Sequence, residues 1–244
     1  MTKLLLDAGT TWSKIMELSK DGSFSDFFVE YEAHSQDVFD QNGNTLFSKS
    51  YLLPSKVLRK LPVQFDFATG HMVQNLLKED SVYTNEIIAL AYGSMKLVPE
   101  LQNATVLDIG SRDAKWIRFK DGKYCDLDWN SACASSTGAT VEMLCKFYDI
   151  NTDDLSFVDE KYSLTCGIFG MEKIMDDIAK GQSAEVCISK YIHGLASNMW
   201  NFAKRPEEIY LSGGFCQNQC FVESLGKYCK VTPLGRNVLL MGLF

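Results

Sequence analysis

The chain of 244 residues has little positive charge and contains no long apolar run. Its 31 acidic residues outnumber its 24 basic residues, and the net charge at neutral pH is −7. Proteins that bind a nucleic-acid backbone need a positive surface field, so we expect no nucleic-acid partner. No apolar run approaches the roughly 18 residues that span a bilayer, and the N-terminus enters a predicted strand without a signal-like segment. We therefore expect a cytoplasmic protein without a membrane partner.

No low-complexity linker interrupts the chain, and no short-period repeat is present apart from the two turns described below. Hydrophobic residues make up 46% of the chain and charged residues 23%, which is enough apolar material for a sizeable core. A chain of this length suits two lobes of roughly 100 residues each. We expect an N-terminal lobe over residues 1–92, joined by the C-terminal segment 233–244, and a C-terminal lobe over residues 93–232.

Strand-like and helix-like segments alternate along the chain, which indicates a layered α/β fold. The predicted strands cover residues 3–7, 12–18, 26–31, 63–69, 104–108, 114–119, 123–127, 208–212 and 230–232. The predicted helices cover residues 50–59, 81 or 85 to 96, 135–148, 167–180 and 183–203, with a further helix after residue 218 and a turn at 40–44.

Two similar aspartate-glycine turns are the most informative feature of the sequence. They read Leu-Asp7-Ala-Gly9-Thr10-Thr11-Trp-Ser-Lys14 and Leu-Asp108-Ile-Gly110-Ser111-Arg-Asp113-Ala-Lys115. In each, an apolar strand ends on a carboxylate, a Gly permits a hairpin, and a second strand follows. The backbone N–H groups and hydroxyls of such a turn can cradle phosphate oxygens. A lone turn of this kind is usually only a hairpin, but the repetition predicts two half-sites that face one nucleotide.

The carboxylates of Asp7 and Asp108 are placed to hold Mg²⁺ through water, since this ion prefers one or two carboxylates together with phosphates. A third element, Ile209-Tyr-Leu-Ser212-Gly213-Gly214-Phe-Cys-Gln217-Asn218, takes a strand into a Gly-Gly turn, where adenosine can lie against bare backbone. Asp7 and Asp108 are therefore the candidate catalytic residues. The candidate nucleotide-binding residues are Gly9, Thr10, Thr11, Lys14, Gly110, Ser111, Asp113, Lys115, Gly213, Gly214, Gln217 and Asn218.

These motifs resemble those of the superfamily that includes actin, sugar and acetate kinases and heat-shock chaperones. The pattern Leu-Asp-x-Gly-Thr-Thr-x-x-Lys is similar to the first phosphate loop of that superfamily. The resemblance implies an α/β fold of two ribonuclease-H-like lobes, as in actin-like ATPases, with ATP in a cleft between them. Residues 104–148 resemble one branch more closely: the ATP-dependent iron-sulfur activators of 2-hydroxyacyl-CoA dehydratases and of benzoyl-CoA reductases.

That branch carries the patterns Asp-Ile-Gly-Gly-Gln-Asp-x-Lys, Asn-Asp-Lys-Cys-Ala-Ala-Gly-Thr-Gly and Ser-Thr-Cys. This chain has Asp108-Ile-Gly-Ser-Arg-Asp-Ala-Lys115, Asn130-Ser-Ala-Cys133-Ala-Ser-Ser-Thr137-Gly138 and Ser163-Leu-Thr-Cys166. The resemblance extends nearly end to end, including Ala68-Thr-Gly70, Asn85-Glu86 and Thr232-Pro-Leu234. The chain departs from the branch at Ser111, Arg112, Ser131, Ala132, Ser136 and Met171. The nucleotide grip is expected to survive these changes.

Eight cysteines in a chain expected in the cytoplasm indicate reduced thiols rather than a disulfide framework. Cys133 and Cys166 each precede a predicted helix, whose positive end favours a thiolate. One chain offers two such thiolates, whereas a 4Fe-4S cluster normally takes four, and a twofold dimer supplies the other two. The resemblance also implies one cluster per homodimer, bound by these two cysteines of each copy. Inert structural thiols are the alternative interpretation. Cys216 and Cys220 have an i, i+4 spacing that could hold a metal, but both follow the Gly-Gly turn where adenosine would pack.

The resemblance implies that the chain hydrolyses ATP with Mg²⁺ and passes an electron from the cluster to an iron-sulfur dehydratase or reductase component. Two alternatives remain open. A small-molecule kinase of the same superfamily would pass the γ-phosphate to an acceptor, with Asp113 available as a base. A nucleotide-binding protein without catalysis would keep the dimer and would have lost hydrolysis through the altered Ser111-Arg112 turn.

Only three histidines are present, which leaves few candidates for acid–base chemistry. His34 is expected in a polar loop and His193 inside a helix, and both are interpreted as surface or packing residues. His71 adjoins the expected cleft, which makes it the strongest exception. The branch usually has an aromatic residue at that position.

Overall fold

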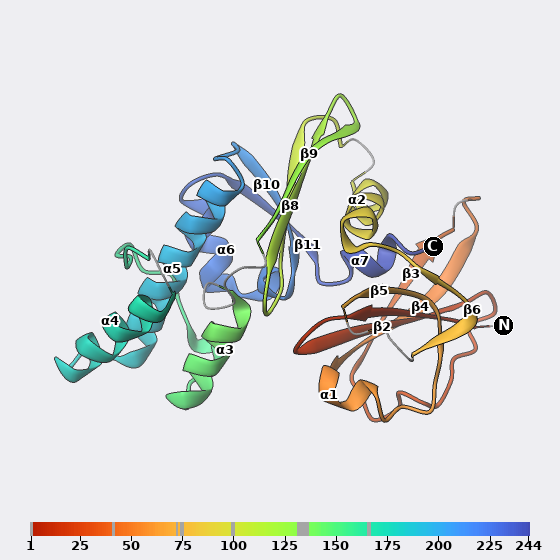
Figure 1. The fold of residues 1–244 in the computed structure, drawn as a ribbon, viewed down its shortest axis with the longest axis horizontal. Coiled ribbons are helices and arrows are strands. Elements are labelled where there is room, and N and C mark those ends of the chain that lie inside the picture. Colours follow the sequence, from red (N-terminus) through yellow and green to blue (C-terminus); the bar gives the residue numbers. More distant parts are fainter. Residues whose placement is uncertain are drawn as a thin grey trace. The chain divides into compact units, whose positions relative to one another are not determined.

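The computed structural model describes residues 2–40, 42–71, 73, 76–98, 101–130, 137–164 and 167–244 (Figure 1). The chain divides into two compact units, Met1–Pro99 with Asn237–Phe244 and Glu100–Arg236. Each unit is built on its own mixed sheet, one with six strands and one with five. The predicted α/β class is therefore confirmed. Among the described helices, none combines the length and the apolar character that a bilayer crossing requires.

The first unit contains a six-stranded sheet in the order β3-β4-β2-β1-β5-β6. Its strands are β1 (Lys3–Ala8), β2 (Trp12–Ser19), β3 (Ala33–Phe39), β4 (Thr45–Pro54), β5 (Phe65–Gly70) and β6 (Leu77–Tyr83). β1 pairs with β2 in antiparallel fashion and with β5 in parallel fashion, and β5 and β6 are also parallel. The carboxyl ends of β1, β5 and β6 consequently lie along one edge of this sheet.

Three helices complete the first unit: α1 (Ser55–Leu58), α2 (Glu86–Leu97) and α7 (Val238–Met241). Two glycines allow α2 and α7 to pack with their backbones close together. A Cβ atom at Gly93 would overlap the carbonyl of Val238, and one at Gly242 would overlap the carbonyl of Ala89. This contact fixes the C-terminal residues to the first unit.

The second unit contains a five-stranded sheet in the order β11-β10-β7-β8-β9. Its strands are β7 (Ala104–Ile109), β8 (Ala114–Lys120), β9 (Lys123–Asn130), β10 (Glu208–Gly213) and β11 (Lys230–Gly235). Its helices are α3 (Gly138–Phe147), α4 (Gly167–Ala179), α5 (Ala184–Phe202) and α6 (Gln219–Gly226), which lie on one side of the sheet in Figure 1. The core between them includes Trp116 of β8 and Ile188, Tyr191 and Leu195 of α5, all fully buried. Burial of these large side chains is the main stabilising contribution in this unit.

Two predicted elements of the first unit and the predicted place of His34 are wrong. Residues 26–31, expected to be extended, form turns, and the strand begins only at Ala33. The helix expected over 50–59 is strand β4 as far as Pro54, followed by the four residues of α1. β4 pairs with both β2 and β3, so tertiary pairing decides the conformation of a segment whose local pattern is ambiguous. His34 accordingly lies in β3 rather than in a loop.

Strand β6 was not predicted at all, because its sequence gives little apolar alternation. It contains the consecutive polar residues Lys78, Glu79 and Asp80, all exposed. β6 is an edge strand, and edge strands carry charged side chains that discourage pairing with other chains.

A buried carboxylate anchors the loop that precedes β3. Glu17 of β2 is fully buried, and its Oε1 accepts hydrogen bonds from the Ser25 N–H at 3.1 Å and from the Ser25 hydroxyl at 2.6 Å. Its Oε2 accepts a hydrogen bond of 2.8 Å from the Tyr51 hydroxyl. The Tyr51 ring packs against Phe28, with the ring centroids 5.0 Å apart. Glu17 therefore joins the loop, β2 and β4.

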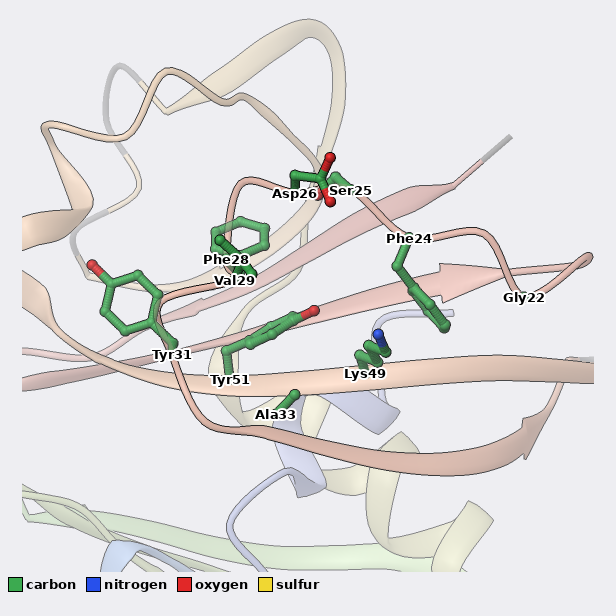
Figure 2. A pocket seen from close by; sticks show the side chains of 10 residues that line it. All are labelled: Gly22, Phe24, Ser25, Asp26, Phe28, Val29, Tyr31, Ala33, Lys49 and Tyr51. Atoms are coloured by element: carbon green, nitrogen blue, oxygen red, sulfur yellow. The ribbon is translucent and has the colours of Figure 1, made fainter.

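Next to Glu17, the loop before β3 and the sheet form a pocket of about 320 Å³ that is open to solvent (Figure 2). Phe24, Phe28 and Tyr51 line it, and the ammonium group of Lys49 lies 4.6 Å from the centre of the Phe24 ring. The buried oxygens beneath the pocket are already hydrogen-bonded to Ser25 and Tyr51. We interpret the pocket as a packing feature of the anchored loop.

Replacing Tyr51 by Phe should destabilise the first unit by about 1–3 kcal/mol, because the buried Glu17 carboxylate loses a donor while the ring is retained. Burial and the neighbouring Glu17 raise the pKa of the Tyr51 hydroxyl, so it remains a donor throughout the neutral range. Urea unfolding followed by circular dichroism measures the effect. Tyr92→Phe, on the exposed side of α2, is the matched control. Equal stability of the two variants would contradict the anchor.

Candidate functional site

The first aspartate-glycine turn connects β1 to β2 and places a carboxylate beside an ammonium group. Asp7 and Lys14 are directly opposite in the antiparallel pairing, and Lys14 Nζ lies 2.7 Å from Asp7 Oδ2. Asp7 is buried, with 5% of its surface exposed. Thr10 and Thr11, between the two strands, are exposed to solvent. The turn thus presents two hydroxyls above a buried, charge-compensated carboxylate.

Ser55, at the start of α1, braces this turn. Its hydroxyl donates a hydrogen bond of 2.7 Å to the Gly9 carbonyl, and its N–H donates to the Thr11 carbonyl at 2.8 Å. At Gly9 a side chain is excluded, since a Cβ atom would overlap the carbonyl of Trp12. Sequence reasoning missed Ser55, because nothing local connects it to a turn more than forty residues earlier.

The second turn connects β7 to β8 and repeats the same arrangement. Asp108 and Lys115 are opposite in the pairing, and Lys115 Nζ lies 3.7 Å from Asp108 Oδ2 and 3.7 Å from Asp113 Oδ2. Both Asp108 and Lys115 are almost fully buried, at 4% and 3% exposure. The Ser212 hydroxyl donates to Asp108 Oδ1 at 3.1 Å. In both turns a lysine therefore offsets the cost of burying the carboxylate.

Asp113 is held inside the second turn. Its Oδ2 accepts a hydrogen bond of 2.6 Å from the Trp129 indole, and its backbone carbonyl accepts one of 2.9 Å from the Gly110 N–H. These contacts restrain the carboxylate that the kinase alternative would use as a base. The Trp129 indole thus orients Asp113.

The second turn is also hydrogen-bonded to the start of α3. The Ser111 carbonyl accepts from the Thr137 hydroxyl at 2.5 Å and from the Ala139 N–H at 2.9 Å. The Gly138 N–H donates to the Gly110 carbonyl at 3.2 Å. Ser111 thus acts on α3 through its backbone carbonyl, in addition to the phosphate role predicted for it.

The Gly-Gly turn, the third predicted motif, lies at the end of β10. β10 is next to β7 in the sheet. Ser212 is paired with Asp108, and Gly213 with Ile109, so this turn adjoins the second one. Gly213 has a φ of +87°, and a Cβ atom there would overlap the Ile109 carbonyl. Gly214 is exposed, and a Cβ atom there would meet nothing within 4 Å. The backbone at Gly214 is therefore open to a ligand.

Of the other two residues predicted in this element, Gln217 is exposed and Asn218 begins α6. Asn218 accepts a hydrogen bond from the Phe221 N–H at 2.8 Å through its side-chain oxygen, as an N-cap does.

The predicted site residues thus form two groups, one in each unit. The first unit holds Asp7, Gly9, Thr10, Thr11 and Lys14, and the second holds Gly110, Asp108, Ser111, Asp113, Lys115, Gly213, Gly214, Gln217 and Asn218. Cys133 and Cys166 lie outside the described residues. Within the described part of the chain, no group of three or more His, Cys, Asp or Glu side chains is arranged to hold a metal ion.

The residues of both turns fit a magnesium nucleotide. Buried carboxylates, hydroxyls and turn N–H groups are hard donors suited to Mg²⁺ and phosphate. Because each carboxylate is paired with a lysine, we expect it to hold the metal through water and the lysine to face phosphate oxygens. Beside Asp7 in the β1–β5 pairing lies Thr69, whose hydroxyl is fully buried and has no hydrogen-bond partner among the described residues.

Two of the similar proteins are named as activators of acyl-CoA dehydratases. The (R)-2-hydroxyglutaryl-CoA dehydratase activating ATPase of Acidaminococcus fermentans is 26% identical over 202 residues, which cover 78% of this chain and 77% of that protein. The activator of lactoyl-CoA dehydratase of Anaerotignum propionicum is 27% identical over 183 residues, covering 71% of this chain and 70% of that protein.

Solved structures agree on the fold. An activator of the 2-hydroxyisocaproyl-CoA dehydratase from Clostridium difficile, with bound ADPNP, has a TM-score of 0.73 at 19% identity, covering 100% of this chain and 92% of that one. Component A of the (R)-2-hydroxyglutaryl-CoA dehydratase of Acidaminococcus fermentans has a TM-score of 0.67 at 21% identity, covering 100% and 96%.

A family model matches residues 63–239, which is most of the chain. This match confirms the resemblance drawn from the aspartate-glycine turns and the cysteine motifs. The chain belongs to the BadF/BadG/BcrA/BcrD ATPase family.

Proposed function

We propose that this ATPase activates an acyl-CoA dehydratase or a related reductase by passing it an electron from a 4Fe-4S cluster. The observation that carries the proposal is the aspartate-lysine pair that occurs in both turns, Asp7 with Lys14 and Asp108 with Lys115. The chain that contains these pairs belongs to an ATPase family. The names of the similar activators support a dehydratase as partner.

Each turn would contribute to nucleotide binding in this proposal. Lys14 and Lys115 would face phosphate oxygens, and Asp7 and Asp108 would hold Mg²⁺ through water. The backbone at Gly214 receives the adenosine. Such a site acts by positioning the phosphates and stabilising the charge that develops during hydrolysis.

The cluster ligands in this proposal are Cys133 and Cys166 of two copies of the chain. A cluster of this kind supplies one-electron redox chemistry when bound. The other six cysteines suit the role poorly. Cys145, Cys187, Cys216, Cys220 and Cys229 are buried in the core of the second unit, and Cys125 is exposed on β9. Burial raises the pKa of Cys145 and of Cys229 to about 11, which keeps both as thiols, whereas metal ligation needs a thiolate.

The hydrogen bonds from the start of α3 to the second turn support a coupling of the nucleotide to the segment that carries Cys133. Thr137 is four residues after Cys133, and its hydroxyl is bonded to the Ser111 carbonyl. A change in the turn on hydrolysis would therefore shift the start of α3. In this proposal, the start of α3 is the two-state element that the nucleotide would bias, as a coupling mechanism requires.

Cluster ligation is tested by the iron and sulfide content of protein purified without oxygen. Wild-type protein should be brown and contain about two iron atoms per chain, one cluster per dimer. Cys133→Ser and Cys166→Ser should each lose most of that iron. Cys125→Ser, at an exposed position on β9, should keep it. A colourless wild-type protein without iron would refute the electron-transfer function and leave an ATPase of another role.

Coupling is tested by hydrogen exchange of the peptide that contains α3, with and without a non-hydrolysable ATP analogue. The analogue should slow exchange in wild type and in Thr137→Ser. Thr137→Val keeps the shape of the side chain but loses the donor to Ser111, so the slowing should largely disappear. Nucleotide affinity should change by less than about threefold, roughly 0.7 kcal/mol. An undiminished slowing in Thr137→Val would show that α3 responds by another route.

A further inference from the structure

Two ionisable side chains meet at the same edge of the first sheet as the first phosphate turn. β1, β5 and β6 run parallel, so their carboxyl ends share this edge. The turn with Thr10 and Thr11 follows β1, His71 follows β5, and Glu86 follows β6 by three residues. Ligands of α/β sheets bind where the carboxyl ends of parallel strands meet.

The backbone after β5 lies directly against the backbone of the first turn. Ala8 is paired with Gly70, which has a φ of +95°. A Cβ atom at Gly70 would lie only 2.5 Å from the Ala8 carbonyl oxygen, so the two strands approach closely. His71 is the next residue, which places it beside the turn that carries Gly9.

Glu86 and His71 form a close pair. His71 Nδ1 lies 2.7 Å from Glu86 Oε1. The Glu86 side chain is only 8% exposed, whereas that of His71 is 44% exposed. Glu86 stands in the first turn of α2, whose N-cap is Asn85, and the positive end of that helix favours an ionised carboxylate there. The imidazole holds this carboxylate in place and faces solvent with the rest of its ring.

This pair differs from the other carboxylates near the turns. Asp7 and Asp108 are each paired with a lysine ammonium group, and Asp113 is paired with Lys115 and Trp129. Glu86 is instead paired with the imidazole of His71, which is not a lysine ammonium group. A carboxylate that accepts a proton from water must not be held in a permanent ion pair with a lysine ammonium group.

We infer that Glu86 is the base that activates the attacking water during ATP hydrolysis and that His71 is the positioning residue that orients it. The inference rests on the ATPase activity of the family and on nucleotide binding at the first turn. The water oxygen attacks the γ-phosphorus, and its proton passes to Glu86. The bond from the γ-phosphorus to the bridging oxygen breaks, and ADP leaves with the electron pair. Glu86 then releases the proton to solvent beside His71.

Steady-state hydrolysis and equilibrium nucleotide binding of the full chain test the role of Glu86. Glu86→Gln should lower kcat by at least about 100-fold, the usual contribution of a general base, and leave the affinity for ATP within about threefold. Added formate should partly restore the turnover of Glu86→Ala, because it replaces the missing carboxylate. Glu79→Gln, exposed on β6, is the matched control and should behave as wild type.

Variants of His71 test its positioning role. Because the buried Glu86 carboxylate loses a donor in such variants, urea unfolding of each variant is measured beside its turnover. His71→Phe removes the donor to Glu86 and should lower kcat about tenfold, a loss within the range that one hydrogen bond contributes. The affinity for ATP should be unchanged. His71→Asn retains an N–H donor and should recover part of the loss. Wild-type turnover in Glu86→Gln would overturn the assignment of the base, and equal kcat values for wild type and His71→Phe would overturn the role of the imidazole. A wild-type chain that binds no ATP would instead refute the nucleotide site itself.

Discussion

Both turns depend on the pairing of a buried carboxylate with a lysine on the opposite strand of the hairpin. Asp7 with Lys14 and Asp108 with Lys115 repeat this pairing in two sheets of different strand order. An aspartate buried at the end of a strand is tolerated only if its charge is compensated, and the lysine opposite provides that compensation. In the proposed function, the aspartate of each pair would hold the metal and the lysine would face phosphate. The structural requirement and the proposed chemical role therefore fall on the same two side chains.

Sequence reasoning succeeded where local pattern and tertiary structure agree. The hairpin strands around Asp7 and Asp108 follow from short apolar runs that end at Asp-x-Gly, and helix α5 lies within the predicted range 183–203. It failed in the first unit at β4, where pairing on both sides overrides an ambiguous segment, and at the charged edge strand β6. The failure to predict β6 is relevant to the site, because Glu86 follows the end of this strand by three residues.

The contacts between the turns and their neighbours could not be read from the sequence. Ser55 at Gly9, Ser212 at Asp108 and Thr137 at Ser111 each join residues far apart in the chain. Only the fold brings these pairs together. The cysteine motif could be recognised from the sequence, but the path proposed from nucleotide to Cys133 depends on the hydrogen bonds of Thr137 and Ala139 to one carbonyl.

The most direct test of the phosphate grip is isothermal titration calorimetry of the wild-type chain with ATP and with adenosine, in the presence of Mg²⁺. If both turns hold phosphate and metal, ATP should bind at one site per chain and at least about tenfold more tightly than adenosine, a difference of roughly 1.4 kcal/mol. Removal of Mg²⁺ should weaken the binding of ATP and leave that of adenosine unchanged. Equal affinities for ATP and adenosine, or no binding of ATP, would contradict the account.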